Sequence, residues 1–182
     1  MSTRKSIRKT APRSRRDAIS LLKADHRQVA SWFSSFGKTR SEVRKQQLAS
    51  RICSALKVHT RIEEEIFYPA FLEQTQAQAM HHEAVVEHDA AKKLIAEIEA
   101  ARPTDEYYDA KVTVLSEMIK HHVKEEEQPG GMFAKARKSD MDLAELGRRL
   151  AARKKQLMNS SGSSTPRRSR AERGTGRAEG RV

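Results

Sequence analysis

The stretch that decides the fold is residues 56–66, LKVHTRIEEEI, in which His59 and Glu63 stand four positions apart. In a helix this spacing places both side chains on one face, together with the apolar Leu56 and Ile66. An imidazole and a carboxylate buried among apolar side chains must be paired with each other or coordinate a metal ion. The segment therefore predicts a helix whose buried face carries a polar or metal-binding pair.

A second copy of this pattern lies at residues 115–126, LSEMIKHHVKEE, where His122 and Glu126 have the same spacing. Leu115 and Ile119 precede His122 at helical intervals, so this pair also falls on an apolar stripe. Two such pairs favour a dinuclear metal centre inside a helical bundle, because bundle metal sites are built from inward side chains of facing helices.

The surrounding sequence repeats apolar residues every three or four positions from residue 17 onward, without a convincing strand pattern. We expect four long helices and a shorter fifth one, over about 17–36, 41–69, 76–101, 105–128 and 139–157. Glycine and proline supply the stops, at Gly37, Pro69, Pro103 and Pro129-Gly130-Gly131, although Pro69 could also kink its helix. The fold class predicted is all-α, an antiparallel up-down-up-down four-helix bundle with a short extra C-terminal helix.

The first and third predicted helices each add a histidine to their apolar stripes. His26 lies between Leu22 and Val29, and His88 lies between Ala84 and Ala91. If the helices meet at one level, a mixed nitrogen and oxygen set can hold two ions and leave positions open for a small ligand. The candidate metal ligands are His26, His59, Glu63, His88, His122 and Glu126. A ferritin-like site needs Glu-x-x-His, which this chain does not contain, so that interpretation fails.

The charge of the chain, +12 over 182 residues, is concentrated at its ends. Residues 1–16 contain seven Lys and Arg and no acid, residues 160–182 contain six Arg and two Glu, and the rest is nearly neutral. We therefore divide the chain into a basic flexible arm (1–16), the bundle (17–137), an amphipathic helix (138–158) and a disordered basic tail (159–182). One cysteine allows no internal disulfide, and no apolar run is long enough to span a membrane, so we expect a cytoplasmic protein.

At these residues the chain resembles the hemerythrin-like family of HHE cation-binding domains, whose pattern is His … His-x-x-x-Glu … His … His-x-x-x-Glu. The resemblance rests on His26 in LLKADHRQV, His88 in VVEHDAAKKL and the two His-x-x-x-Glu pairs, and it covers about residues 17–137. It implies a non-haem centre of two iron ions, bridged by carboxylates and by an oxo or hydroxo group, that handles O₂, NO or peroxide. Zinc and manganese are the alternative metals.

Two departures separate this chain from oxygen-carrying hemerythrins, whose third helix has His-x-x-x-His and whose fourth has His-x-x-x-x-Asp. Here Ala84 stands four residues before His88, and the fourth helix offers His-x-x-x-Glu. Compared with those carriers, this chain is expected to bind, sense or scavenge its small ligand rather than carry it reversibly. Peroxidase- or catalase-like turnover and NO reduction are the enzymatic alternatives.

Three points stay open in the sequence. His121 and Glu125 repeat the spacing of His122 and Glu126, although His122 continues the apolar stripe. A metal-bound histidine usually donates its other N–H to a carboxylate or carbonyl, and Asp25 or Glu87 could accept it, but residues adjacent to the ligands are expected to point elsewhere on their helices. The aromatic residues near Pro69 are expected to pack in the core or at the end of the bundle. Finally, the basic arms could bind nucleic acid non-specifically through phosphates, or they could only keep the protein soluble.

Overall fold

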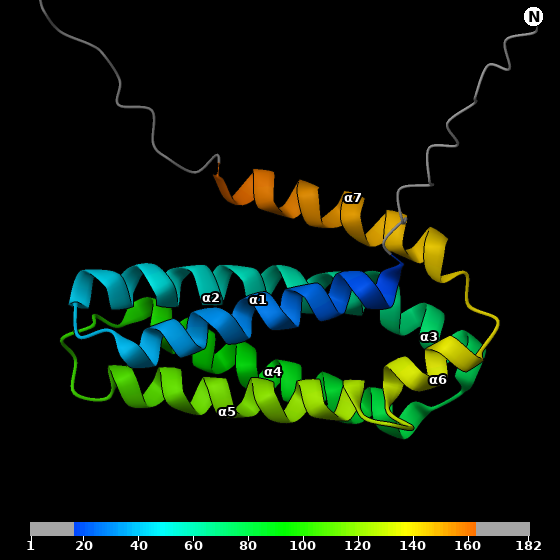
Figure 1. Ribbon diagram of the computed structural model, residues 1–182, viewed down its shortest axis with the longest axis horizontal. Helices are drawn as coiled ribbons and strands as arrows, with labels where there is room; N and C mark the ends of the chain where they lie inside the picture. Colours follow the sequence, from blue (N-terminus) through cyan, green and yellow to red (C-terminus); the bar gives the residue numbers. More distant parts are fainter. Residues whose placement is uncertain (1–16, 163–182) are drawn as a thin grey trace, which may run out of the picture.

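The computed structural model describes residues 17–162, and every regular element in this range is helical, which confirms the all-α prediction. The predicted arm 1–16 and residues 163–182 of the predicted tail lie outside the described residues. Four long helices form a bundle, and a fifth long helix lies across one side of it (Figure 1). The bundle helices are α1 (Ala18–Lys38), α2 (Glu42–Ile62), α4 (Gln78–Ala100) and α5 (Tyr108–Glu127), and the fifth is α7 (Leu143–Gly162).

The four bundle helices alternate in direction along the view of Figure 1, where the chain runs leftward in α1 and returns rightward in α2. A turn of three residues, 39–41, joins these two helices, and Ser41 caps α2 by accepting a hydrogen bond from the Arg44 N–H. The first helix passes through Gly37 and ends at Lys38, so the predicted stop at Gly37 was two residues early. Gly37 does not adopt the left-handed conformation that a glycine stop uses.

The core consists of two apolar clusters on either side of a polar layer. One cluster contains Phe33, Ile52 and Leu115, and the other contains Leu22, Phe67 and Phe133. On α1, α2 and α4 the buried histidine falls between residues of the first cluster and residues of the second. On α5, His122 follows Leu115 of the first cluster, and the chain then reaches Met132 of the second. The polar layer is therefore enclosed by apolar side chains above and below.

The second predicted helix was expected to end near Pro69. Instead, the chain stays helical past Pro69 through a wider turn. This π-helical turn, η1 (Glu63–Phe67), ends with the Tyr68 N–H donating to the carbonyl of Glu63, five residues earlier. Proline has no N–H to donate, and its ring crowds the carbonyl four residues before it. The wide turn avoids this conflict, so the chain continues as α3 (Tyr68–Thr75) with Pro69 in its first turn.

A short helix that the sequence did not predict, α6 (Met132–Lys138), closes one end of the bundle. Gly131 makes the preceding turn possible, because a Cβ atom there would lie 2.2 Å from the carbonyl oxygen of Glu125. The chain then enters α7, which begins four residues later than predicted because Asp142 accepts a hydrogen bond from the Glu145 N–H. The helix continues to Gly162, so residues 159–162 belong to α7 and not to a disordered tail.

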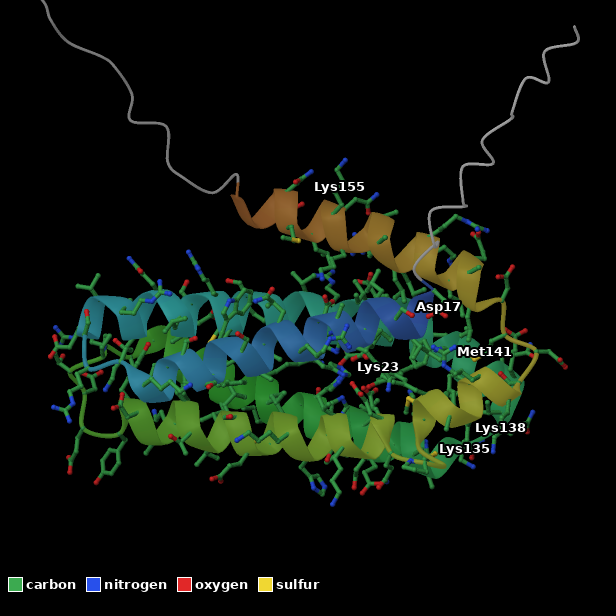
Figure 2. The ribbon with its side chains drawn as sticks, in the orientation of Figure 1. Asp17, Lys23, Lys135, Lys138, Met141 and Lys155 are labelled. Atoms are coloured by element: carbon green, nitrogen blue, oxygen red, sulfur yellow. The ribbon has the colours of Figure 1, made fainter. Side chains whose placement is uncertain are left out.

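The last long helix, α7, packs on α1, α2 and η1 (Figure 1). Figure 2 shows Lys155 on the side of α7 that points away from the bundle, whereas Arg153 and Lys154 of the same helix form ion pairs with residues of the bundle. Among the described residues, no helix combines the length and apolar character that crossing a membrane requires.

Asp17 caps the first helix, and we expect Asp17→Ala to lower the free energy of unfolding by about 1 kcal/mol. Its Oδ1 accepts a hydrogen bond of 2.7 Å from the Ser20 N–H. Partial burial opposes ionisation, but this bond and Arg137 lower the pKa of Asp17 below 3.8. The ionised carboxylate therefore stabilises the folded state at pH values above its ordinary pKa. This stabilisation is lost as the pH falls through the lowered pKa of the folded state.

Urea unfolding at pH 7 and pH 3 measures this effect. The difference between the Asp17→Ala variant and the wild type should shrink at pH 3. Ser41→Ala provides the control, because it removes an uncharged cap whose hydrogen bond is 3.3 Å long. An Asp17 effect of equal size at both pH values would contradict the assignment.

Candidate metal centre

The six residues predicted as metal ligands all lie in the polar layer, and each is at most 7% exposed. Glu63 is completely buried. The histidines come from four different helices, one from each long helix of the bundle, and the two glutamates lie four residues after the histidines of α2 and α5. The structure therefore brings the whole set together: His26, His59, Glu63, His88, His122 and Glu126.

The histidines form two pairs whose Nε2 atoms face each other. The Nε2 atoms of His26 and His59 are 2.9 Å apart, and those of His88 and His122 are 3.2 Å apart. Two imidazole nitrogens bound to one ion at about 2.1 Å, in neighbouring positions, lie about 3 Å from each other. Each pair thus has the separation that two ligands of a single ion would need.

The two glutamates lie between these pairs. Glu63 Oε2 is 3.3 Å from His59 Nε2 and 3.5 Å from His88 Nε2, so it contacts one histidine of each pair. Glu126 Oε2 lies 3.5 Å from His26 Nε2 and 3.7 Å from His122 Nε2. Both carboxylates therefore connect the α1–α2 half of the layer with the α4–α5 half.

The glutamate oxygens provide a test of whether this layer suits a cation. Both oxygens of Glu63 and Oε2 of Glu126 are buried and accept no hydrogen bond from the described residues. Burying a carboxylate without hydrogen bonds is costly, and native proteins avoid it unless another group compensates the charge. Two carboxylates and four imidazoles are a donor set that divalent transition metals prefer. The residues present therefore fit a pair of metal ions.

Each histidine turns its other ring nitrogen toward a carboxylate outside the layer. His26 Nδ1 lies 2.8 Å from Glu127, His88 Nδ1 lies 3.0 Å from Glu64, and His122 Nδ1 lies 2.7 Å from Glu87. His59 Nδ1 is 3.6 Å from Asp25, which is longer than a hydrogen bond. An ionised carboxylate only accepts, so Nδ1 carries the proton in His26, His88 and His122, and a neutral imidazole there keeps its Nε2 lone pair for the layer.

These outer carboxylates correct an expectation from the sequence. Asp25 and Glu87 do point away from the histidines beside them in the chain, but each points toward a histidine of the neighbouring helix. Glu64 and Glu127, which directly follow the buried glutamates, do the same. The signal was present as an acid next to each candidate ligand, but its partner could not be identified without the packing of the helices.

The buried groups perturb one another strongly. Burial and the charge of His59 lower the pKa of His26 to about 4. Burial also disfavours a charge on His59, but Glu63 and Asp25 outweigh it and raise the pKa of His59 to about 10. Burial and the nearby Glu63 raise the pKa of Glu126. Burial also opposes ionisation of Glu63, but His59 outweighs it and holds the pKa of Glu63 below its usual range. Glu63 and Glu126 thus compete for the positive charge of the protonated histidines between them.

Tyr68 is a member of the site that the sequence assigned only to packing. Its hydroxyl lies 3.2 Å from His88 Nε2 and donates to Glu126 Oε1 over 3.4 Å. The π-helical turn explains the position, because five residues make one turn there and place Tyr68 above Glu63. The sequence signal was the run Phe67-Tyr68-Pro69 shortly after the His-x-x-x-Glu pair of the second predicted helix, which forms part of the family resemblance. Phe133 of α6, which belongs to the same apolar cluster as Tyr68, stacks on the ring of His26.

A small cavity adjoins the four histidines, with room for about one water-sized molecule. It lies on the side of the first apolar cluster, and Val29, Leu56, Ile119 and Val123 provide its apolar walls. A molecule in this cavity would contact the four imidazoles on one side and mainly apolar side chains on the other.

The doubled motif HHVKEEE contributes its two His-x-x-x-Glu pairs in different ways. His122 and Glu126 are buried in the layer, whereas the side chain of His121 is 63% exposed and lies 3.2 Å from Glu125. His81, which shares the helical face of His88, packs its ring edge-on against Tyr68, and no hydrogen bond or ion pair joins its side chain to the six residues. His121 and His81 therefore lie outside the layer.

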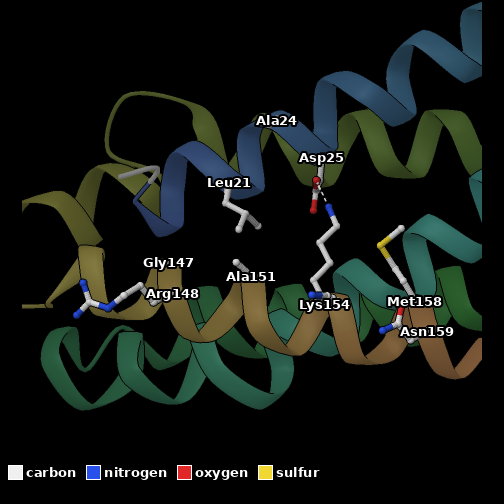
Figure 3. A pocket seen from close by; sticks show the side chains of 10 residues that line it. Leu21, Ala24, Asp25, Gly147, Arg148, Ala151, Lys154, Met158 and Asn159 are labelled. Carbon is white, nitrogen blue, oxygen red and sulfur yellow. Dashed lines mark hydrogen bonds and ion pairs between the residues drawn. The ribbon is translucent and has the colours of Figure 1, made fainter. Parts of the chain in front are cut away.

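The last helix reaches the layer through Asp25. Lys154 of α7 forms an ion pair with Asp25, and Figure 3 shows the two side chains meeting across the groove between α1 and α7. The groove measures about 570 Å³ and has Leu21, Ala151 and Met158 among its lining residues. Arg153 of α7 also pairs with Glu65 of η1. The helix outside the bundle thus contacts the carboxylate that faces His59.

The chain is similar to known proteins in sequence and in fold. The model of the hemerythrin HHE cation-binding domain matches residues 17–134. The crystal structure of a hemerythrin HHE cation-binding domain-containing protein from Mycobacterium kansasii is similar in fold, with a TM-score of 0.68 and 23% sequence identity. The match covers 83% of this chain and 94% of that chain. A search of curated proteins gives no significant match.

Proposed function

Because this chain belongs to the family of hemerythrin HHE cation-binding domains, we propose that its polar layer holds two non-haem iron ions in an antiparallel four-helix bundle. The observation that carries the proposal is the pair of buried carboxylates, Glu63 and Glu126, whose unpartnered oxygens lie between two pairs of imidazole nitrogens. Two cations would compensate these charges and satisfy these oxygens together.

The distances support a division of the ligands between two ions. His26 and His59 would hold one ion and His88 and His122 the other, because each pair has its Nε2 atoms about 3 Å apart. Glu63 and Glu126 would bridge the ions, since each contacts one histidine of either pair. Asp25, Glu64, Glu87 and Glu127 would keep the four imidazoles oriented with Nε2 inward.

The small ligand of this centre would be O₂, NO or peroxide. Bound iron supplies the redox and Lewis-acid chemistry for such ligands. The residues of the chain supply a water-sized apolar cavity beside the histidines and a phenol, Tyr68, whose hydroxyl can donate a hydrogen bond into the layer. Ala84 lies buried where a further histidine on the third long helix would stand, so we assign the protein to sensing or scavenging rather than to oxygen carriage.

Metal analysis of aerobically purified protein tests the proposal. We expect two irons per chain and a near-ultraviolet charge-transfer absorption, both of which should disappear after reduction and chelation and return on reconstitution with Fe²⁺. Fewer than one iron per chain after reconstitution would overturn the dinuclear centre. Two ions of zinc or manganese per chain, with no uptake of iron, would overturn the choice of metal only.

A further inference from the structure

A second cluster of side chains that could bind a metal lies on the outside of the bundle, next to the Nδ1 side of His122. It consists of Glu87 on α4 and His121 and Glu125 on α5, whose ligand atoms all lie within 4.8 Å of one another. His121 Nε2 is 3.2 Å from Glu125 Oε1 and 3.5 Å from Glu87 Oε1. One imidazole and two carboxylates on rigid helices form a set that suits a divalent cation.

Glu87 connects this outer cluster with the buried layer. Its Oε2 accepts a hydrogen bond of 2.7 Å from His122 Nδ1, while its Oε1 faces His121. A single carboxylate therefore contacts a candidate ligand of the buried centre on one side and the outer cluster on the other.

The charge around Glu87 distinguishes it from the other three outer carboxylates. Asp25 pairs with Lys154, Glu64 with Lys92 at 2.7 Å, and Glu127 with Lys23 at 3.0 Å; Figure 2 shows Lys23 reaching from α1 toward α5. Among residues 17–160, no lysine or arginine nitrogen lies within 4.0 Å of the carboxylate of Glu87. The negative charge at this one corner of the layer is not compensated by a basic side chain.

A groove of about 90 Å³ leads from this corner into the layer. Its lining includes the exposed Glu83, the half-buried Glu87 and Glu125, and finally His122 and Glu126 of the buried layer. Glu126 is 2% exposed and has a buried oxygen without a hydrogen-bond partner. The groove thus joins acidic surface residues to an uncompensated carboxylate inside.

The equivalent corner on the other half of the bundle lacks these features. The residues of α2 that correspond to His121 and Glu125, one position before His59 and Glu63, are Val58 and Ile62. The acid there, Asp25, is covered by Lys154 of α7. Only the α4–α5 face, among the described faces of the layer, combines outer metal-binding groups with an acidic groove.

From these observations we propose that Glu87, His121 and Glu125 form an outer site for a divalent transition-metal ion, through which the ion enters the buried centre. The inference rests on the proposed dinuclear centre and adds a route into it. The acidic groove raises the local cation concentration, the outer site captures the ion, and Glu87 stands beside His122, the first buried ligand that the ion meets.

The uptake of Co²⁺ by the full-length apoprotein tests the route, since its visible absorption reports binding without oxidation by air. Stopped-flow traces should be recorded for the wild type, for His121→Ala/Glu125→Gln, and for the control His82→Ala/Glu106→Gln, which makes the same changes at exposed residues away from the groove. We expect uptake about tenfold slower in the first variant only, because a charged funnel accelerates capture by at least that factor. The final content of two ions should be unchanged.

A second measurement detects the outer site by itself. In Glu63→Gln/Glu126→Gln, equilibrium dialysis against Co²⁺ should leave one weakly bound ion, and adding His121→Ala/Glu125→Gln should remove it. Equal uptake rates in all proteins with two ions bound would overturn the route and leave the dinuclear centre intact. A final content below two ions in His121→Ala/Glu125→Gln would make the pair part of the centre itself and also overturn the route. Absence of bound Co²⁺ in every protein would contradict both proposals.

Discussion

Replacing Glu63 with glutamine is expected to abolish the binding of two metal ions per chain and the stabilisation that they confer. Glu63 is completely buried and lies between the two histidine pairs, so it would serve both ions at once. Glutamine keeps the shape of the side chain but removes the charge that compensates the cations. A metal present at a thousand times its Kd stabilises a folded protein by about 4 kcal/mol, and the variant should lose most of this.

Metal analysis together with thermal unfolding, with and without added Fe²⁺ under anaerobic conditions, measures both effects. The matched control is Glu117→Gln, which makes the same change at an exposed residue of α5. The control should bind two ions and show the wild-type rise in melting temperature. If Glu63→Gln did the same, the buried carboxylate would not be a bridge between two ions.

Replacing Ile52 with alanine should destabilise the protein by about 2–5 kcal/mol while leaving its metal content unchanged. Ile52 is fully buried in the apolar cluster of Phe33 and Leu115, and α2 separates it by almost two turns from His59. The truncation removes buried methyl groups and leaves a cavity that the close-packed helices can only partly fill.

Urea unfolding of the apoprotein gives the loss of stability, and metal analysis of the folded variant gives its ion content. Val43→Ala is the control, since Val43 lies on the same helix but is 70% exposed, and its effect should stay within about 0.5 kcal/mol. A loss of metal from folded Ile52→Ala would show that the centre depends on the packing of the distant cluster, contrary to this expectation.

The sequence was sufficient to predict the helices of the bundle and the six residues that meet in the polar layer. Helical periodicity carries this information locally: His59 and Glu63 share a face whatever the rest of the chain does. The ends of elements were harder to predict. Pro69 was interpreted as a stop or a kink, but a π-helical turn accommodates it. The close turn at Gly131 leads from α5 into α6, a helix that has no strong pattern of its own.

The surroundings of the layer could not be predicted, because they depend on contacts between helices. Asp25 and Glu87 face histidines on neighbouring helices, at sequence separations that no local pattern indicates. Tyr68 enters the site through the extra residue in the π-helical turn, which changes the phase of everything after Glu63. In both cases the side chains were visible in the sequence, but their directions were not.

The outer carboxylates have a further consequence when they are followed from helix to helix. His26 on α1 faces Glu127 on α5, and His122 on α5 faces Glu87 on α4. His88 on α4 faces Glu64 in η1, which continues α2, and His59 on α2 faces Asp25 on α1. The links run in one direction and close into a circuit, so each helix gives one contact and receives one. No helix can leave the middle of the bundle without breaking two of them. Backbone amides around the circuit should therefore exchange with solvent only when the whole bundle unfolds, while those at the outer ends of the helices exchange by fraying.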